Sequence, residues 1–292
     1  MHRAANSVSR RGIMTGLALL AACSEPAAGP EFDDAAAPRA EIGLLTSLPI
    51  YWPESDSPAD MLNAQAPLPW PRVVIEKRHA LLPLDALDGK QGLARVKVAV
   101  LAQPRPLSPA ENVALDDWVR AGGHVLVFAD PALTEHSRFH LGDRRRPQDV
   151  ILLSPILTRW GLLLSFDEDA APGQWILSDP VAGPLPVHLP GKLEISPDTD
   201  RDVKDCRIEV GAVVARCRIG RGSATIIADA SLLEAGEFRG DPERGAALVA
   251  LIDSLAAKAP DQAGKRWGGL GNDGDLTASQ PQPGASTDVE RD

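Results

Sequence analysis

Two aspartates stand directly after apolar runs that are typical of buried strands. Asp130 follows His124–Ala129, and Asp229 follows Ser223–Ala228. In a doubly wound α/β sheet, ligands bind beyond the carboxyl ends of the parallel strands, so both carboxylates are expected at that edge. Two carboxylates in one cleft can act as a general acid and a general base. This spacing supports the hypothesis of a hydrolase of polysaccharide or peptide.

Other polar residues end neighbouring strands and complete a candidate ligand cleft. The full set is Thr46, Ser47, Gln103, Arg105, Asp130, Asp229 and Ser231. Small polar groups beside two carboxylates suit a sugar or a cation. The alternative is that the two aspartates only cap the turns that follow them, because Asp side chains accept nearby backbone N–H groups.

The only basic cluster in this acidic chain consists of Arg138, Arg144, Arg145 and Arg146. These arginines either pair with Asp143, Asp149 and the acids at 167–169, or form an anion patch. A free patch would bind a phosphate or a polyanion such as lipopolysaccharide. The second possibility gives the hypothesis of a polyanion binder.

No motif in the sequence predicts a metal site or a cofactor. His136 and His140 have the spacing that places two imidazoles on one helix face, but no third ligand accompanies them in the sequence, so a surface pair is favoured. Gly220-Arg221-Gly222 is a tight turn without the spacing and lysine of a phosphate-binding loop.

Cys206 to Ile219 reads as a β-hairpin that carries two of the three cysteines. If Gly211 and Ala212 form the turn, the register places Cys206 opposite Cys217. In an oxidising compartment the two thiols would form a disulfide. Two free thiols are the alternative.

The elements that position these residues alternate between strand and helix. Strands are expected at 42–48, 73–75, 96–101, 124–129, 162–166 and 223–228, and short extended pieces between 174 and 195. Ser108-Pro109-Ala110-Glu111 predicts a helix with a capping box that ends at Gly122-Gly123. The strand, helix and strand between 96 and 129 predict a right-handed βαβ unit. Further helices are expected at 149–160 and from Asp241 to about 258.

The N-terminus carries a twin-arginine pattern, Ser9-Arg10-Arg11, and a short apolar run from Gly12 to Ala22. The run is too short to span a bilayer and suits a signal peptide. Leu20-Ala21-Ala22-Cys23 resembles the lipobox of bacterial lipoproteins. This resemblance implies cleavage before Cys23, diacylation of its thiol and a lipid anchor on the periplasmic side of the cell envelope. Ser24 favours the outer membrane over the inner one.

Composition divides the chain into four parts: a signal peptide at 1–22, a lipidated tether at 23–40, an α/β domain at 41–259 and a disordered tail at 260–292. The signal peptide holds three arginines and no acid, so its removal takes the formal net charge from −10 to −13. Such an acidic protein is a poor partner for nucleic acid.

Three segments in order carry a resemblance to a known family: 118–131 (WVRAGGHVLVFADP), 157–162 (LTRWGL) and 219–233 (IGRGSATIIADASLL). Together they resemble the class I glutamine-amidotransferase-like domain of uncharacterised ABC-type transport systems, including the gliding-motility auxiliary protein. The resemblance spans about 41–257. It implies a flavodoxin-like parallel sheet with helices on both faces, here with a small β-hairpin appendage, and a binding or assembly role beside ABC transporter subunits.

The chain departs from true amidotransferases in its chemistry. Those enzymes need a Cys nucleophile at a sharp strand-to-helix turn and a His to activate it. Cys206 and Cys217 lie in a predicted hairpin, and Cys23 is the lipid site, so no glutaminase activity is expected. The sequence therefore favours a non-catalytic envelope lipoprotein. The alternatives are an envelope hydrolase that uses the strand-end carboxylates and a polyanion binder that uses the arginine cluster.

Overall fold

The computed structural model describes residues 40–55, 67–88, 92–169, 173–197, 205–235 and 241–259. The chain divides into two units, 1–36 and 37–292, and every described residue belongs to the second. The signal peptide, Cys23, nearly all of the tether and the C-terminal tail lie outside the described residues. In the described part, no helix has the length and apolar character needed to cross a membrane.

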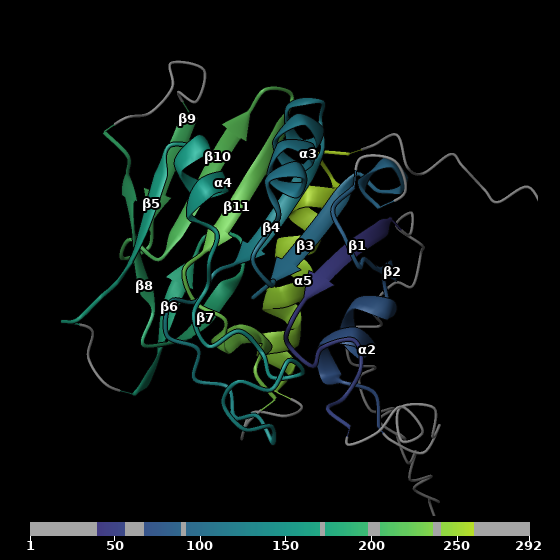
Figure 1. Cartoon of the computed structure of the whole chain (residues 1–292), viewed down its shortest axis with the longest axis vertical. Helices are drawn as coiled ribbons and strands as arrows, with labels where there is room; N and C mark the ends of the chain where they lie inside the picture. Colours follow the sequence, from purple (N-terminus) through teal and green to yellow (C-terminus); the bar gives the residue numbers. More distant parts are fainter. Residues whose placement is uncertain are drawn as a thin grey trace, which may run out of the picture. The chain divides into compact units, whose positions relative to one another are not determined.

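A mostly parallel sheet forms the centre of the domain (Figure 1). Within the described residues it has seven strands in the order β2-β1-β3-β4-β11-β10-β9. The five parallel strands are β1 (Glu41–Thr46), β2 (Ala80–Pro83), β3 (Val98–Ala102), β4 (His124–Phe128) and β11 (Gly222–Ile227). Taken in chain order, these strands have the flavodoxin arrangement 2-1-3-4-5. The predicted α/β class is confirmed.

Helices cover both faces of this sheet. Figure 1 shows α3 (Pro109–Arg120) and α4 (Ser154–Arg159) on one face and α5 (Pro242–Ala256) on the other, where α2 (Trp70–Glu76) packs against α5. β3 and β4 are buried along their whole length because both faces are covered. Their Val, Leu, Ala and Phe side chains build the core.

The βαβ unit follows its prediction closely. The Ser108 hydroxyl accepts the backbone N–H of Glu111 at 3.2 Å, and the Glu111 carboxylate accepts the backbone N–H of Ser108 at 2.9 Å. This reciprocal capping box starts α3 and also fixes the turn that leaves β3. β3 and β4 then pair in parallel, as the right-handed crossover requires.

The predicted hairpin is present, but it is not an appendage. β9 (Asp205–Glu209) pairs with β10 (Val214–Ile219), and β10 continues the main sheet by pairing antiparallel with β11. The side chains of Val214, Cys217 and Ile219 are buried, so β10 must pack inside the domain, and its pairing with the main sheet places it there. Cys206 lies opposite Cys217 in the ladder, and a disulfide joins them, which confirms that pairing.

Two sequence-based assignments were wrong. Residues 73–75, expected as a strand, lie in α2, where Pro71 occupies the first turn and Arg72 pairs with Glu76 one turn later. The strand beside β1 is instead Ala80–Pro83. The helix expected from Asp149 begins only at Ser154, because the Ile151 N–H bonds back to the strand-end carbonyl of residue 130.

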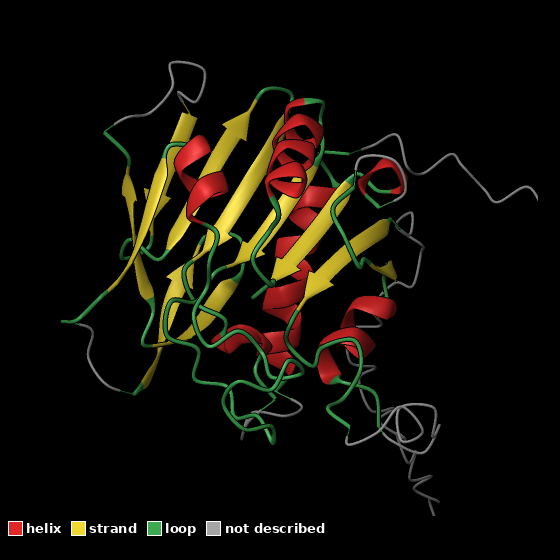
Figure 2. Cartoon of the chain, viewed as in Figure 1, coloured by secondary structure: helices red, strands yellow, loops and turns green. Residues whose placement is uncertain are grey.

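Two small antiparallel pairs complete the described part. β5 (Leu162–Phe166) pairs with β8 (Gly191–Ile195), and β6 (Gln174–Asp179) pairs with β7 (Gly183–His188). Short 3₁₀ turns lie at η1 (Leu93–Arg95) and η2 (Ser231–Leu233). Loops gather around the carboxyl ends of the parallel strands (Figure 2), which is the edge where the candidate site lies.

Candidate functional site

Asp130 lies just beyond β4 at the carboxyl edge of the sheet, and its residue surface is 0% exposed. Its carboxylate accepts the backbone N–H groups of Ala132 at 2.8 Å and Ala230 at 3.1 Å. The second contact ties the loop after β4 to the loop after β11. Burial raises the pKa of the Asp130 carboxyl to about 7, although the two backbone N–H groups oppose this rise.

Asp229 occupies the equivalent place beyond β11 and is 1% exposed. It accepts the backbone N–H groups of His188 at 2.8 Å and Ser231 at 2.6 Å. Burial, followed by repulsion from Asp130, raises the pKa of Asp229 well above its ordinary value. The two carboxylates are neighbours, as the fold predicts, but they hold backbone turns and are closed off from solvent. The hydrolase hypothesis needed them in an open pocket, so this arrangement does not support it.

Gln103 and Ser47 connect three of the strand-end loops. The fully buried Gln103 amide donates to the carbonyls of Asp130 (2.9 Å) and Gln148 (2.8 Å), and its oxygen accepts the Asp130 N–H (2.9 Å). Ser47 donates to the Gln103 carbonyl and accepts the Gln148 N–H. Gln103 has a φ of 44°, a costly conformation for a side-chain-bearing residue, which these contacts hold in place.

Two other residues of the predicted cleft, Thr46 and Arg105, bind partners outside the Asp130–Asp229 pair. The Thr46 hydroxyl hydrogen-bonds with the backbone of Leu48. Arg105 turns toward the start of α3, where its guanidinium binds Glu111 at 2.8 and 3.0 Å. This pairing is the main reason why the pKa of Glu111 falls to about 2. Arg105 therefore belongs to the helix cap and not to a ligand cleft.

The four arginines of the predicted anion patch, Arg138, Arg144, Arg145 and Arg146, lie in the loop between β4 and α4. Arg145 pairs with Asp143 at 2.8 Å, and Arg146 pairs with Asp149 at 2.7 Å. Arg145 and Arg146 therefore form ion pairs with neighbouring aspartates, which the sequence offered as the alternative to an anion patch. The same loop carries His136 and His140, and neither of them lies in a helix. No group of three or more His, Cys, Asp or Glu is placed to hold a metal among the residues described.

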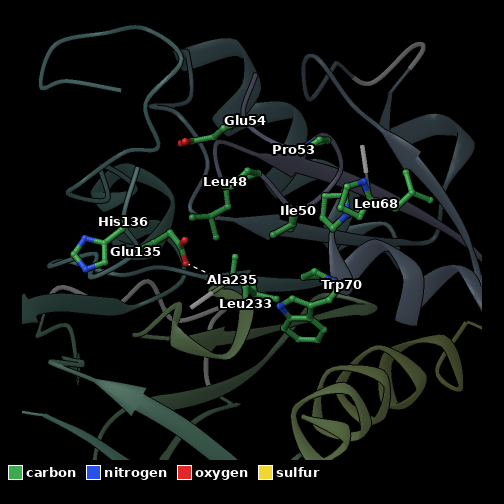
Figure 3. Close-up of a pocket in the computed structure, with 14 residues that line it drawn as sticks. Leu48, Ile50, Pro53, Glu54, Leu68, Trp70, Glu135, His136, Leu233 and Ala235 are labelled. Carbon is green, nitrogen blue, oxygen red and sulfur yellow. Dashed lines mark hydrogen bonds between the residues drawn. The ribbon is translucent and has the colours of Figure 1, made fainter. Parts of the chain in front are cut away.

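An open pocket of about 390 Å³ lies between the loops that follow β1, β4 and β11, at the carboxyl edge of the sheet (Figure 3). Its apolar lining comes from Leu48, Ile50, Leu68, Trp70 and Leu233 and from five prolines. The Trp70 indole N–H donates to the carbonyl of residue 234 at 3.2 Å, which fixes the ring at one side. The size and the lining fit a small-molecule or peptide site.

Two carboxylates and an imidazole occupy the other side of this pocket: Figure 3 places Glu54, Glu135 and His136 opposite Trp70 and Leu68. Glu135 accepts the N–H of Ala235 at 2.8 Å. Burial raises the pKa of Glu135, and the charges of Glu234 and Glu54 add to the rise. The pocket is therefore amphipathic, with one apolar and one acidic end.

A second cavity, of about 220 Å³, adjoins the first across the shared loop 48–54. Thr46 and Ser47 from the predicted cleft reach this cavity, as does Arg145 from the predicted anion patch. Aromatic rings line it too: Tyr51 and Trp52 lie edge to face, and the Arg145 guanidinium lies 4.2 Å from the centre of the Phe139 ring.

Sequence reasoning missed both cavities. Their walls come from the proline-rich stretch 49–71, which reads only as a long loop, and from residues after β4 and β11. The signal available was the dense run of Pro, Trp and Tyr, since aromatic residues in an irregular segment need a surface to pack on.

No protein-family model and no curated protein sequence matches this chain. Among solved structures, it is similar to an exo-β-1,4-mannosidase from Opitutaceae bacterium strain TAV5, with 15% identity and a TM-score of 0.43 over 74% of this chain and 36% of that one. It is also similar to the mmIFT52 N-terminal domain, with 13% identity and a TM-score of 0.45 over 74% of this chain and 96% of that one. A third similar structure is a putative ThuA-like protein from Bacteroides uniformis, with 12% identity and a TM-score of 0.41 over 76% of this chain and 93% of that one. The chain spans about a third of the mannosidase.

Proposed function

We propose that this protein is a non-catalytic, lipid-anchored binding module of the bacterial cell envelope, accessory to an ABC-type transport system. The lipobox-like tetrad ending in Cys23 supports the anchor, and the resemblance of three segments to the amidotransferase-like domain of such systems supports the partner. The binding role rests on one observation from the fold: the open amphipathic pocket at the carboxyl edge of the sheet.

The state of the two buried aspartates favours binding over hydrolysis. General acid–base catalysis requires a carboxyl group within reach of substrate. Asp130 and Asp229 each accept two backbone N–H groups and expose at most 1% of their surface. In their place the pocket offers hydrophobic walls and two partly exposed carboxylates, which suits recognition of a ligand or of a partner segment.

Site-specific photo-crosslinking in intact cells tests this function. A photoreactive residue in place of the exposed His136, at the pocket, should capture a transporter subunit or its cargo. The same group in place of the exposed Glu168, in the loop after β5, serves as the control. Equal crosslinking at both positions, or none at His136, would contradict a binding role for the pocket.

A further inference from the structure

We propose that the pocket binds a small primary amine with a hydrocarbon chain. Its ammonium group would lie against Glu135 and Glu54, and its chain would lie along Trp70. This inference rests on the proposed function, because it names the ligand class of the same pocket. It follows from the lining of the two ends and from their charge.

The apolar end defines the hydrocarbon part of the ligand. Trp70 is held by its indole N–H, and Ile50 and Leu233 are buried residues of the core that present part of their surface to the pocket. Leu68 is 48% exposed, which leaves a large hydrophobic side chain at the rim. An alkyl chain that covers these surfaces removes apolar area from water, which favours binding.

The acidic end defines the charge of the ligand. Among the described lining residues there are two carboxylates, one imidazole and no lysine or arginine. Glu54 accepts hydrogen bonds from the Ser137 hydroxyl (2.6 Å) and the Arg138 backbone N–H (2.9 Å). Glu135 accepts the backbone N–H of Ala235. These are neutral donors, so they do not cancel the charge of either carboxylate.

Two arginines act on these carboxylates through space, and each has a contact elsewhere, while the lining His136 acts on Glu135. Arg146 acts on Glu54 through space, but its guanidinium pairs with Asp149. Arg244 acts on Glu135 and Glu234, and its guanidinium donates to the Ser231 carbonyl. The pocket lining itself therefore offers two carboxylates and no lysine or arginine, and an ammonium group would pair with them. A fatty acid of the same length would meet two like charges.

A titration followed by NMR tests the ligand class. The full-length chain with Cys23→Ala is titrated at pH 8 with hexylammonium, 1-hexanol and hexanoate, and the Trp70 indole signal, assigned with Trp70→Phe, reports binding. We expect hexylammonium to bind at least tenfold more tightly than hexanol, and hexanoate to bind most weakly. Glu135→Gln should remove the preference for the amine. Its affinity for hexanol should stay within about twofold of the wild-type value, and this would show that the pocket remains folded.

Glu168→Gln is the matched control, because it removes a carboxylate outside the pocket and should change nothing. Equal affinity for hexanol and hexylammonium, or an unchanged amine preference in Glu135→Gln, would overturn the ligand class and leave a binding pocket for a neutral ligand. Failure of all three probes to bind would also overturn it. The crosslinking at His136 decides separately whether the proposed function stands.

Discussion

Asp130 couples the stability of the domain to pH. Its pKa is raised to about 7 by burial, from an ordinary value near 3.8. Because the folded state holds this proton more tightly than the unfolded state, the domain is most stable below the unfolded pKa of the group. This contribution to the free energy of unfolding is lost as pH rises toward 7. The loss amounts to at most about 1.4 kcal/mol per pH unit for one group. Asp229 acts in the same direction.

Asp130→Asn should therefore make the domain less sensitive to pH. The amide cannot ionise, so the free energy of unfolding should fall less steeply between pH 4 and pH 7 than in the wild type. Urea denaturation followed by circular dichroism at several pH values measures this slope. Asp117→Asn, at an exposed position on α3, is the control. Parallel curves for Asp130→Asn and the wild type would contradict the prediction.

Glu111 shows the opposite dependence, and its effect belongs to the βαβ element. Its carboxylate binds the Arg105 guanidinium, the Ser108 N–H and the Leu87 N–H, which joins the helix cap to two preceding loops. These contacts hold the pKa of Glu111 at about 2. The stability that they give is present above pH 4.5 and is lost as pH falls toward 2.

Glu111→Gln should cost about 1–3 kcal/mol of unfolding free energy at pH 7, because a charge-assisted contact and one acceptor are lost. The difference from wild type should shrink as pH falls from 4.5 to 2. Chemical denaturation at pH 7 and at pH 3 measures both effects, with Glu168→Gln as an exposed reference. A difference that does not change with pH would mean that the charge of Glu111 does not matter.

The disulfide should stabilise the antiparallel edge of the sheet. Cys206 and Cys217 are 11 residues apart, and closing such a loop in the unfolded chain contributes about 2–4 kcal/mol. The double variant Cys206→Ala, Cys217→Ala should have a free energy of unfolding that is lower by this amount, as measured by urea denaturation. Reduction of the wild type with dithiothreitol should lower its free energy of unfolding equally. If dithiothreitol destabilises the double variant as well, the effect does not come from this bond.

At the scale of the whole molecule, attachment to the membrane should depend on one residue. Under the proposed lipid anchor, Cys23→Ala removes the thiol that would be acylated. The variant should appear as a soluble periplasmic protein in cell fractionation, while the wild type stays with the membranes. Cys206→Ala serves as the control for a lost cysteine. Membrane association that survives Cys23→Ala would contradict the lipid anchor.

Local signals in the sequence determined the alternation of strands and helices. The apolar runs 96–101 and 124–129, and the Ser108–Glu111 cap, fix the βαβ unit within a few residues of its true bounds. The hairpin register followed from its turn, since each residue pair is set by the pair nearest the turn. The apolar run 73–75 misled because three consecutive β-branched residues favour a strand, whereas in the short helix only Ile75 of the three is buried and Val73 is exposed.

Only the tertiary structure decided what the polar residues do. The sequence placed Asp130 and Asp229 at one edge, but it did not show that backbone N–H groups from other loops would bury and occupy both carboxylates. It also did not show the pocket, whose walls come from segments as distant as Leu48 and Leu233. Strand periodicity and capping act over a few neighbouring residues. Burial, shared hydrogen bonds and cavities depend on contacts between distant segments, which exist only after the sheet has formed.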